Sequence, residues 1–240
     1  MGNNQKRESF FKFKKFSISD SAGAMKIGTD GVLLGAWVPV DGIHRAIDIG
    51  CGTGLISIML AQRGVEDVIG IEIDKRASIE ASHNIANCEW KENISVINSD
   101  VTSIDLSIYS PDLIVSNPPF FSDSLHCNEE TRRIARHEGN LNYRSLIELS
   151  SKALGVNGLL AFISPIEREH NIVFYASMNK MFVYRQTFVK TVSSKNPKRI
   201  LWLLGKKICP TVDDVIQIKT ASGEYSTDYI NLTKDFYLHL

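Results

Sequence analysis

The sequence has no excess of charge of either sign, because Lys and Arg together number 27 and so do Asp and Glu. Net charge therefore predicts neither a polyanionic nor a polycationic partner. No apolar run approaches the roughly 20 residues that a membrane-spanning helix needs. The polar, basic start of the chain also lacks the apolar stretch of a signal peptide. These absences argue against a membrane protein and predict a cytoplasmic location.

Cysteine and histidine are sparse and follow no metal-binding pattern. The four cysteines lie far apart with no Cys-x-x-Cys pair, and the six histidines form no His-Glu-x-x-His motif. The sequence therefore predicts reduced thiols, no disulfide framework and no bound metal.

The chain does contain an alternation of short apolar runs and longer amphipathic segments over 240 residues, of which 43% are hydrophobic. β-Branched runs bounded by Gly, Pro, Asn or Asp predict buried strands, and apolar positions at helical spacing predict helices between them. This order predicts an α/β fold with a mostly parallel sheet and helices on both faces. Strands are predicted at 46–50, 68–72, 94–98, 112–116, 159–163, 182–192 and 199–204, and helices at 55–63, 74–87, 142–154, 166–181 and 227–237.

The connection between the last two of these strands, residues 193–197, is too short to hold a crossover helix. We therefore expect strands 182–192 and 199–204 to be antiparallel. A strand-like stretch follows at 215–219. Because the sequence has no internal repeat and no linker, we expect a single globular domain.

A glycine-rich loop follows the first predicted strand, in the stretch Asp48-Ile-Gly-Cys-Gly-Thr-Gly54. A phosphate-binding loop would end in Gly-Lys-Ser or Gly-Lys-Thr, which is missing here. A dinucleotide-binding loop has the spacing Gly-x-Gly-x-x-Gly, whereas this loop has Leu55 in place of the third glycine. The carboxylate of Asp48 is unfavourable beside a pyrophosphate and favourable beside a ligand with a cationic end.

S-Adenosylmethionine is a ligand of that kind. The glycines would let the backbone approach its methionine part, and Asp48 would lie near its ammonium group. Glu72, at the end of the second strand, would accept hydrogen bonds from the ribose hydroxyls, and Asp100, after the third, from the adenine amino group. The predicted cofactor-binding residues are Asp48, Gly50, Gly52, Thr53, Gly54, Glu72, Asp100, Asn117 and Thr29.

The fourth predicted strand ends in Asn117-Pro-Pro-Phe120, where the prolines prevent its continuation. The Asn117 side chain and the rigidly held carbonyls can accept hydrogen bonds from an amino group on a flat ring, and Phe120 can stack on that ring. A plain turn after a core strand is the alternative. The predicted catalytic residues are Asn117, Pro118, Pro119 and Phe120.

These motifs resemble those of class I methyltransferases that act on an amino nitrogen. Along most of the chain, the sequence is similar to the bacterial family that methylates N6 of adenine 37 in a valine tRNA; the similar stretches are 24–37, 48–63, 116–120 and 236–238. The resemblance implies a Rossmann-like sheet of seven strands whose last strand is inserted antiparallel. It also implies S-adenosylmethionine as methyl donor and the anticodon loop as substrate. Phe120 replaces the tyrosine common in adenine enzymes and also occurs in guanine-modifying ones.

The first 40 residues are predicted to form an N-terminal extension that packs on the active end of a methyltransferase domain at 41–240. Within residues 25–37, Thr29 or Asp30 is expected to cap a short helix. Residues 1–16 combine five bases with four phenylalanines. This mixture fits either RNA binding or a hairpin with one buried aromatic face.

The tRNA partner is expected to dock on basic residues, and the protein is expected to act as a monomer. From 170 to 212 the chain has eight bases and no acid, although such a run can also be a solvated face. Three alternatives stay open: an enzyme for guanine in ribosomal RNA or for protein glutamine, a non-catalytic RNA-binding or chaperone module, and a nicotinamide-dependent dehydrogenase. The predicted RNA contacts are Arg132, Arg133, Arg136, Lys195, Lys198 and Arg199.

Overall fold

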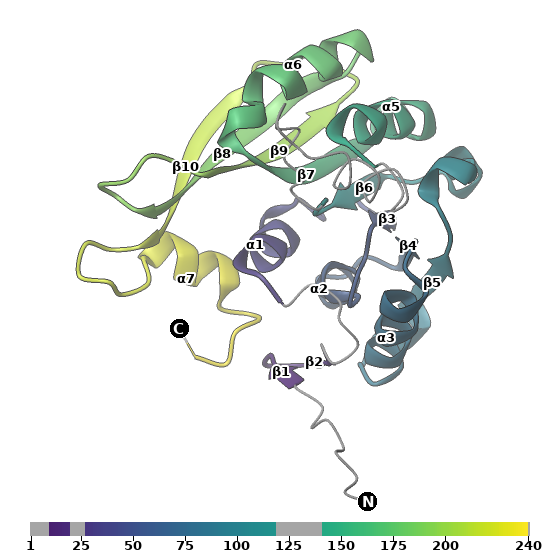
Figure 1. Ribbon diagram of the computed structural model, residues 1–240, viewed down its shortest axis with the longest axis horizontal. Helices are drawn as coiled ribbons and strands as arrows, with labels where there is room; N and C mark the ends of the chain where they lie inside the picture. The colour runs from purple at the N-terminus through teal and green to yellow at the C-terminus, as the bar shows by residue number, and fades with distance from the viewer. Residues whose placement is uncertain (1–9, 20–26, 119–140, 240) are drawn as a thin grey trace, which may run out of the picture.

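A computed structural model describes residues 10–19, 27–118 and 141–239 as a central sheet between two layers of helices (Figure 1). The sheet strands of the described chain follow the predicted order, and most lie within two residues of their predicted bounds. They are β3 (Arg45–Ile49), β4 (Asp67–Glu72), β5 (Ile94–Asn98), β6 (Leu113–Ser116), β7 (Leu159–Pro165), β8 (Phe182–Val192), β9 (Arg199–Gly205) and β10 (Val212–Lys219).

The sheet has the order β10-β8-β9-β7-β6-β3-β4-β5. All neighbouring strands are parallel except β9, which is antiparallel to both β7 and β8. The predicted hairpin and the mostly parallel sheet are therefore confirmed. The expected count of seven strands is one short, because the strand-like stretch at 215–219 extends back to Val212 and pairs with β8. This eighth strand covers the outer edge of β8, whose backbone groups would otherwise lack partners on that side.

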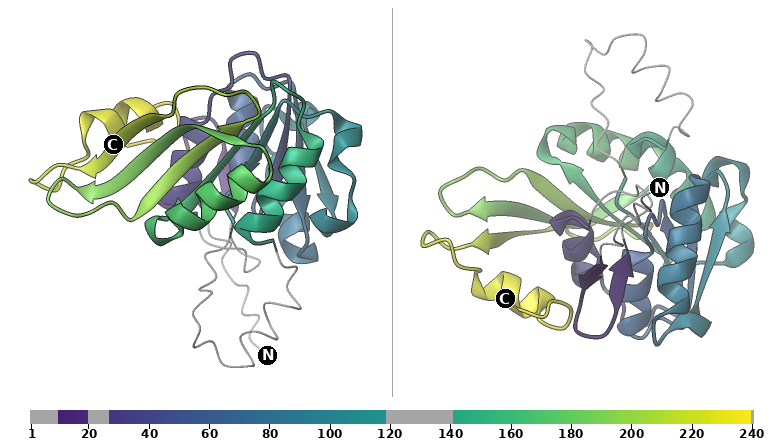
Figure 2. Two further views of the ribbon diagram at one scale, coloured as in Figure 1. Left: turned by 90° about the horizontal axis from the view of Figure 1, so that it is seen from above. Right: turned by 60° about the horizontal axis from the view of Figure 1, so that its bottom comes forward.

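Helices cover both faces of the sheet, as predicted (Figure 2). One apolar core lies under α1, α2, α3 and α7, and a second lies under α5 and α6. None of the described helices is long and apolar enough to cross a membrane. The helices are α1 (Thr29–Trp37), α2 (Leu55–Gln62), α3 (Lys75–Ala86), α5 (Tyr143–Ala153), α6 (Glu169–Met178) and α7 (Thr227–Thr233).

Side-chain caps fix where two of these helices begin. Asp74 accepts hydrogen bonds from the N–H groups of Arg76 and Ala77 at the start of α3, and Asn142 accepts from Ser145 N–H at the start of α5. These caps satisfy N–H groups that have no partner within the helix. They explain why both helices begin where the sequence predicted.

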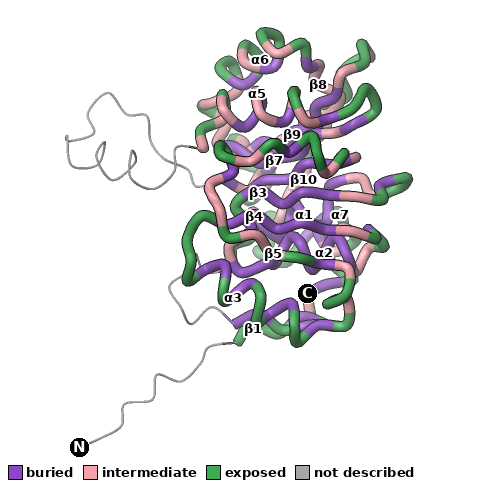
Figure 3. Tube along the Cα trace, turned by 90° about the vertical axis from the view of Figure 1, so that its right-hand side faces the viewer, coloured by how far each residue is buried: buried purple, intermediate pink, exposed green. Residues whose placement is uncertain are grey.

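The strand β6 is buried on both faces. Leu113 and Val115 face one core, Ile114 faces the other, and all three side chains are fully buried. Buried residues follow the strands through the centre of the molecule (Figure 3). The β-branched run before Asn117 is therefore a core strand, as the sequence predicted.

The N-terminal hairpin forms a separate two-stranded sheet from β1 (Phe10–Lys12) and β2 (Ser17–Ser19). Phe13 and Phe16 are buried and stack on each other with ring centroids 4.6 Å apart. The hairpin with a buried aromatic face is therefore confirmed for the described part of this segment, while Phe10 and Phe11 in β1 are exposed.

The C-terminal segment turns toward this hairpin. Helix α7 ends at Thr233 instead of the predicted 237, because residues 234–237 turn to pair with the hairpin. Lys14 donates its N–H to the Phe236 carbonyl at 2.8 Å, and Phe13 forms a backbone bridge with Tyr237. These contacts place the C-terminal segment beside β1.

The thiols of the described chain are free, with Cys51 and Cys88 buried and Cys209 half-buried. Burial raises the pKa of both the Cys51 and the Cys88 thiol, which keeps them protonated and unreactive. Cys127 lies outside the described residues.

Candidate active site

Most of the predicted cofactor-binding and catalytic residues lie within or just after four adjacent strands, β6, β3, β4 and β5. From β3 the chain passes to β4 and β5 on one side, and then returns to β6 on the other side of β3. This reversal is a topological switch point, where open α/β sheets bind ligands at the carboxyl ends of their strands. The glycine loop after β3 and Asn117 after β6 lie on either side of it. The structure therefore brings together two motifs that are more than 60 residues apart in the sequence.

The glycine loop has a backbone that only glycine adopts easily. Gly50 and Gly52 have φ angles of +70° and +55°. No atom lies within 4 Å of the position that a Cβ would take at either residue, so space above this part of the loop is open. Gly54 ends the loop as the N-cap of α2 and packs against α3, where an added Cβ would lie 3.4 Å from Ile85 Cδ1. The loop is thus anchored at one end and accessible to a ligand at the other.

Asp48 is buried inside β3, and its carboxylate is only partly satisfied. Its Oδ2 accepts a hydrogen bond from Ser57 Oγ at 2.7 Å, whereas its Oδ1 has no hydrogen-bond partner among the described residues. Burial raises the pKa of Asp48 to about 7; the Ser57 hydrogen bonds oppose this shift and the nearby Glu72 charge adds to it. A cationic ligand would favour the charged form and offset the cost of its burial.

Glu72 links the tip of β4 to the glycine loop. Its Oε2 accepts the Gly52 N–H and its Oε1 accepts the Asp74 N–H, both at 2.9 Å. Each carboxylate oxygen can accept a further hydrogen bond. Glu72 can therefore hold the loop and still bind a ligand's hydroxyl groups.

Asp100 and Thr53 have structural partners that the sequence did not reveal. Asp100 Oδ1 caps a short 3-10 helix by accepting from both the N–H and Oγ1 of Thr102 at 2.8 Å. The Thr53 carbonyl accepts from Asn84 Nδ2 at 2.9 Å, and the same Asn84 amide exchanges two hydrogen bonds with the backbone of Ser19. Asn84 therefore connects the N-terminal hairpin to the glycine loop. A lone asparagine within a helix gives no sequence signal for this role.

Helix α1 begins beside Asn117, but the predicted cap is wrong. Gly28 is the N-cap residue and forms no side-chain cap, and Thr29 is exposed. The Asp30 carboxylate instead accepts from Arg199 Nε at 3.0 Å, so the first turn of α1 is joined to the start of β9. An added Cβ on Gly31 would lie 3.6 Å from Asn117 Nδ2, so the first turn of α1 packs closely against this amide.

The end of β6 is held to its neighbour by Ser116, whose Oγ donates to the Ile49 carbonyl at 2.8 Å. Asn117 is half-buried and Pro118 is buried. Ser116 thereby fixes the strand tip from which the Asn117 amide extends. Outside the described residues lie Pro119, Phe120, Arg132, Arg133 and Arg136.

The other predicted RNA contacts lie in and after the β8–β9 connection. Lys195 and Lys198 are exposed there, whereas Arg199 is half-buried and paired with Asp30. Only the two lysines therefore present their charge mainly to solvent.

The fold and this site define a Rossmann-like methyltransferase, and comparisons with known proteins agree. The family described as "methyltransferase small domain" matches residues 21–186. The crystal structure of Atu636, a predicted O-methyltransferase from Agrobacterium tumefaciens, has the same fold with a TM-score of 0.68. It is 16% identical and covers 86% of this chain and 96% of its own.

Two curated relatives, each named a tRNA1(Val) (adenine(37)-N6)-methyltransferase, align with nearly the whole chain. The one from Trichodesmium erythraeum is 40% identical and covers 99% of both chains. The one from Bacteroides thetaiotaomicron is 39% identical and covers 96% of this chain and 98% of its own. The chain therefore belongs to the family of tRNA1(Val) (adenine(37)-N6)-methyltransferases.

Proposed function

We propose that this protein transfers a methyl group from S-adenosylmethionine to the N6 amine of adenine 37 in the anticodon loop of a valine tRNA. The observation that carries this proposal is the position of Asn117 at the switch point, beside the glycine loop. The relatives in the same family are named for this reaction. A tRNA substrate would place the reaction in the cytoplasm.

The residues of the glycine-loop region suit S-adenosylmethionine. The buried Asp48 Oδ1, which has no partner among the described residues, would accept from the ammonium group. The open space at Gly50 and Gly52 would receive the methionine part, and Glu72 would accept from the ribose hydroxyls. When bound, this cofactor supplies an activated methyl group on a sulfonium.

The strand tip at Asn117 would orient the acceptor. The exocyclic amine of adenine is a weak nucleophile because its lone pair is delocalised into the ring. The side-chain oxygen of Asn117 and the Pro118 carbonyl would accept its two N–H groups, which favours a pyramidal nitrogen with its lone pair directed at the methyl group. Positioning then supplies much of the rate enhancement. Phe120 would add stacking on the base, which must leave its loop to enter the site.

The first 40 residues would complete the active end as an extension of the domain at 41–240. Two contacts support this proposal. Gly31 packs against Asn117, and Asn84 connects Ser19 to the glycine loop at Thr53. The extension would thus hold both the catalytic amide and the cofactor loop in place.

The exposed lysines of the β8–β9 connection would neutralise tRNA phosphates. We expect the double change Lys195→Glu and Lys198→Glu to weaken tRNA binding and to flatten its salt dependence. The slope of log affinity against log salt should fall by about 0.7 for each lost phosphate contact. Binding titrations at several salt concentrations measure this slope. Lys91→Glu, at the β5 end of the sheet, is the matched control. An unchanged slope in the double variant would remove these lysines from the RNA interface.

The reaction itself is tested by mass spectrometry of nucleosides from tRNA1(Val) of a strain that lacks this protein. We expect N6-methyladenosine at position 37 to be absent and to return when purified protein and S-adenosylmethionine are added. Labelled-methyl transfer to ribosomal RNA or to protein instead would favour the guanine or glutamine alternative. Failure to bind the cofactor in calorimetry would favour a non-catalytic RNA-binding module.

A further inference from the structure

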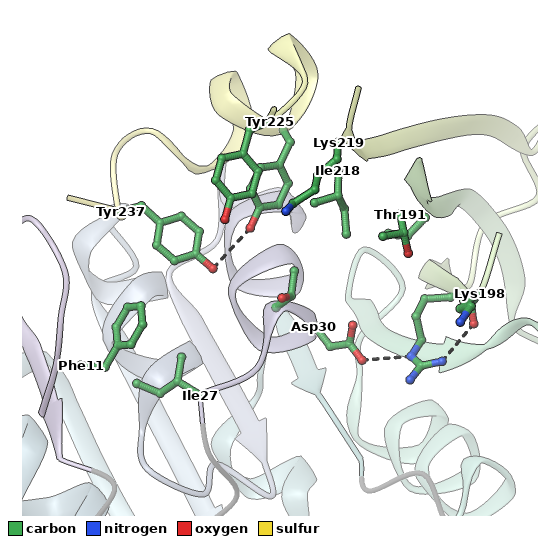
Figure 4. A pocket seen from close by; sticks show the side chains of 13 residues that line it. Phe11, Ile27, Asp30, Thr191, Lys198, Ile218, Lys219, Tyr225 and Tyr237 are labelled. Atoms are coloured by element: carbon green, nitrogen blue, oxygen red, sulfur yellow. Dashed lines mark hydrogen bonds and ion pairs between the residues drawn. The ribbon is translucent and has the colours of Figure 1, made fainter. Parts of the chain in front are cut away.

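A pocket of about 510 Å³ opens beside the first turn of α1 (Figure 4), and no residue of the glycine loop lines it. Its volume is within the range of about 300–1,000 Å³ that is typical of small-ligand sites. Thr29 and Asp30 form one wall, β8 and the start of β9 form another, and aromatic residues of the C-terminal segment form a third. None of the roles assigned above uses this pocket as a whole.

The pocket is adjacent to the proposed catalytic amide. Thr29 and Asp30 line it, and the next residue, Gly31, is the one that packs against Asn117. A single helical turn therefore separates the pocket from the strand tip. A polymer whose reacting group lies at Asn117 would have its neighbouring units within reach of this pocket.

Aromatic side chains dominate one wall. Tyr225 is 40% exposed and stacks on the buried Tyr229, with ring centroids 5.1 Å apart. The hydroxyl of Tyr229 donates to that of Tyr237 at 3.4 Å, and the ring of Tyr237 lies 6.2 Å from that of the exposed Phe11. The wall therefore presents aromatic surface on a framework that is already packed, which favours stacking of a flat ring.

The charged side chains of the pocket are mainly basic. Lys219 Nζ lies 5.5 Å from the centroid of the Tyr225 ring, and the exposed Lys198 lies on the opposite side of the opening. The carboxylate of Asp30 is paired with Arg199, so the two lysines determine the charge that a ligand meets. Aromatic rings beside lysines are the combination that binds single-stranded nucleic acid, with bases on the rings and phosphates on the cations.

Most of the pocket lies outside the part of the chain that the general methyltransferase family shares. That family matches residues 21–186, whereas the residues from β8 onward that line the pocket all follow 186. The pocket is therefore formed mainly by residues outside the shared domain. We expect such residues to recognise the particular substrate, because the shared domain is common to methyltransferases of the general family.

We propose that this pocket binds a second, unstacked nucleotide of the anticodon loop, a neighbour of the adenine that is methylated. The base lies against the exposed ring of Tyr225 and the half-buried ring of Tyr237, and the adjoining phosphates meet Lys198 and Lys219. This inference rests on the proposed function, because it takes the same RNA loop as the ligand. It adds an anchoring site that holds the loop open while the adenine is at Asn117.

The test compares Tyr225→Ala with Tyr225→Phe, using fluorescence anisotropy of a labelled anticodon stem–loop and steady-state kinetics with tRNA1(Val). Loss of one stacked base predicts a decrease in affinity of about tenfold for the alanine variant. KM for tRNA should rise by the same factor with kcat little changed, and the phenylalanine variant should retain wild-type values. Phe174→Ala removes an exposed aromatic ring from α6, in the opposite helix layer, and is the matched control.

An alanine variant of Tyr225 that binds the stem–loop as tightly as the wild type would overturn the proposal. Normal thermal unfolding and normal S-adenosylmethionine binding of this variant establish that the pocket alone was altered. Failure of the proposed function is recognised separately, because it is judged from the wild-type protein, which would then leave adenine 37 unmodified. Loss of RNA affinity in Tyr225→Ala would still support the pocket in that case.

Discussion

Asn117→Ala is expected to lower kcat for methyl transfer by about 10³-fold while leaving S-adenosylmethionine affinity within about threefold of the wild type. The first effect follows because the amide would hydrogen-bond the amine in the transition state, and removal of one such positioned group costs about 10²–10³ in rate. Loss of positioning at the reacting nitrogen adds to this cost. Single-turnover transfer of labelled methyl to tRNA1(Val), together with calorimetry of cofactor binding, measures both quantities.

The side chain of Asn117 is half-buried at a strand tip, so its removal should leave the fold intact. Asn93→Ala is a suitable control, because Asn93 is likewise a half-buried asparagine but lies at the opposite end of β5 from the site, where its amide donates to the Glu66 carbonyl. Turnover at the wild-type rate in Asn117→Ala would reject the catalytic assignment. A large loss of cofactor affinity would instead place the main role of Asn117 in the cofactor site.

Asp48→Asn is expected to stabilise the ligand-free protein at pH 8 and to weaken its binding of S-adenosylmethionine. Burial raises the pKa of Asp48 from 3.8 in the unfolded chain to about 7 in the native state. The native state therefore binds this proton more tightly, and the stability it contributes is complete below about pH 3.8 and is lost as the pH rises to 7. The full loss is on the order of 4 kcal/mol.

Asparagine cannot ionise at position 48 and still offers an oxygen to Ser57. The free energy of unfolding of Asp48→Asn should therefore exceed that of the wild type by several kcal/mol at pH 8, and by progressively less toward pH 5. Urea denaturation across this range measures the difference. Asp105→Asn, at an exposed helix cap, is the matched control. A difference that does not change with pH would mean that Asp48 is not the group that titrates.

The same substitution removes the proposed partner of the cofactor ammonium group. Removal of one member of a buried ion pair costs about 3–5 kcal/mol, so affinity at pH 8 should fall by at least about 10²-fold. In the wild type, a protonated Asp48 must lose its proton before it can pair, so affinity should increase with pH up to about 7. This dependence should disappear in Asp48→Asn. Calorimetry in buffers of different ionisation enthalpy would detect the released proton.

Much of the fold was predictable from the sequence because its signals are local. A buried strand such as β6 is recognisable from Leu113, Ile114 and Val115 alone, and the short connection after Val192 determines that β9 is antiparallel. The glycine loop is similarly a local pattern, with its conformation set by residues that tolerate positive φ. The parallel pairing of β3 with β6 then brings Asn117 and the glycine loop, which the sequence analysis assigned to one site, to neighbouring strand ends.

The features that the sequence did not predict depend on contacts between distant segments. The pairing of Arg199 with Asp30 joins residues 169 positions apart, and it replaced the helix cap expected for Asp30. Asn84 reaches across 65 residues to Ser19. The strand-like stretch at 215–219 was predicted, but its start at Val212 and its pairing with β8 were not, since Val212 and Val215 are exposed. None of these contacts has a periodicity or spacing that a single sequence reveals.

The contact between β1 and the C-terminal segment affects the order in which the proposed cofactor site and the aromatic pocket form during folding. The Lys14 side chain reaches the Lys234 carbonyl across 220 residues, and the aromatic wall that includes Phe11 and Tyr237 depends on the same junction. Long-range junctions are completed late in folding, whereas β3, β4 and the glycine loop are close in sequence. We therefore expect a newly synthesised chain to form the proposed cofactor site before the pocket proposed for the RNA loop.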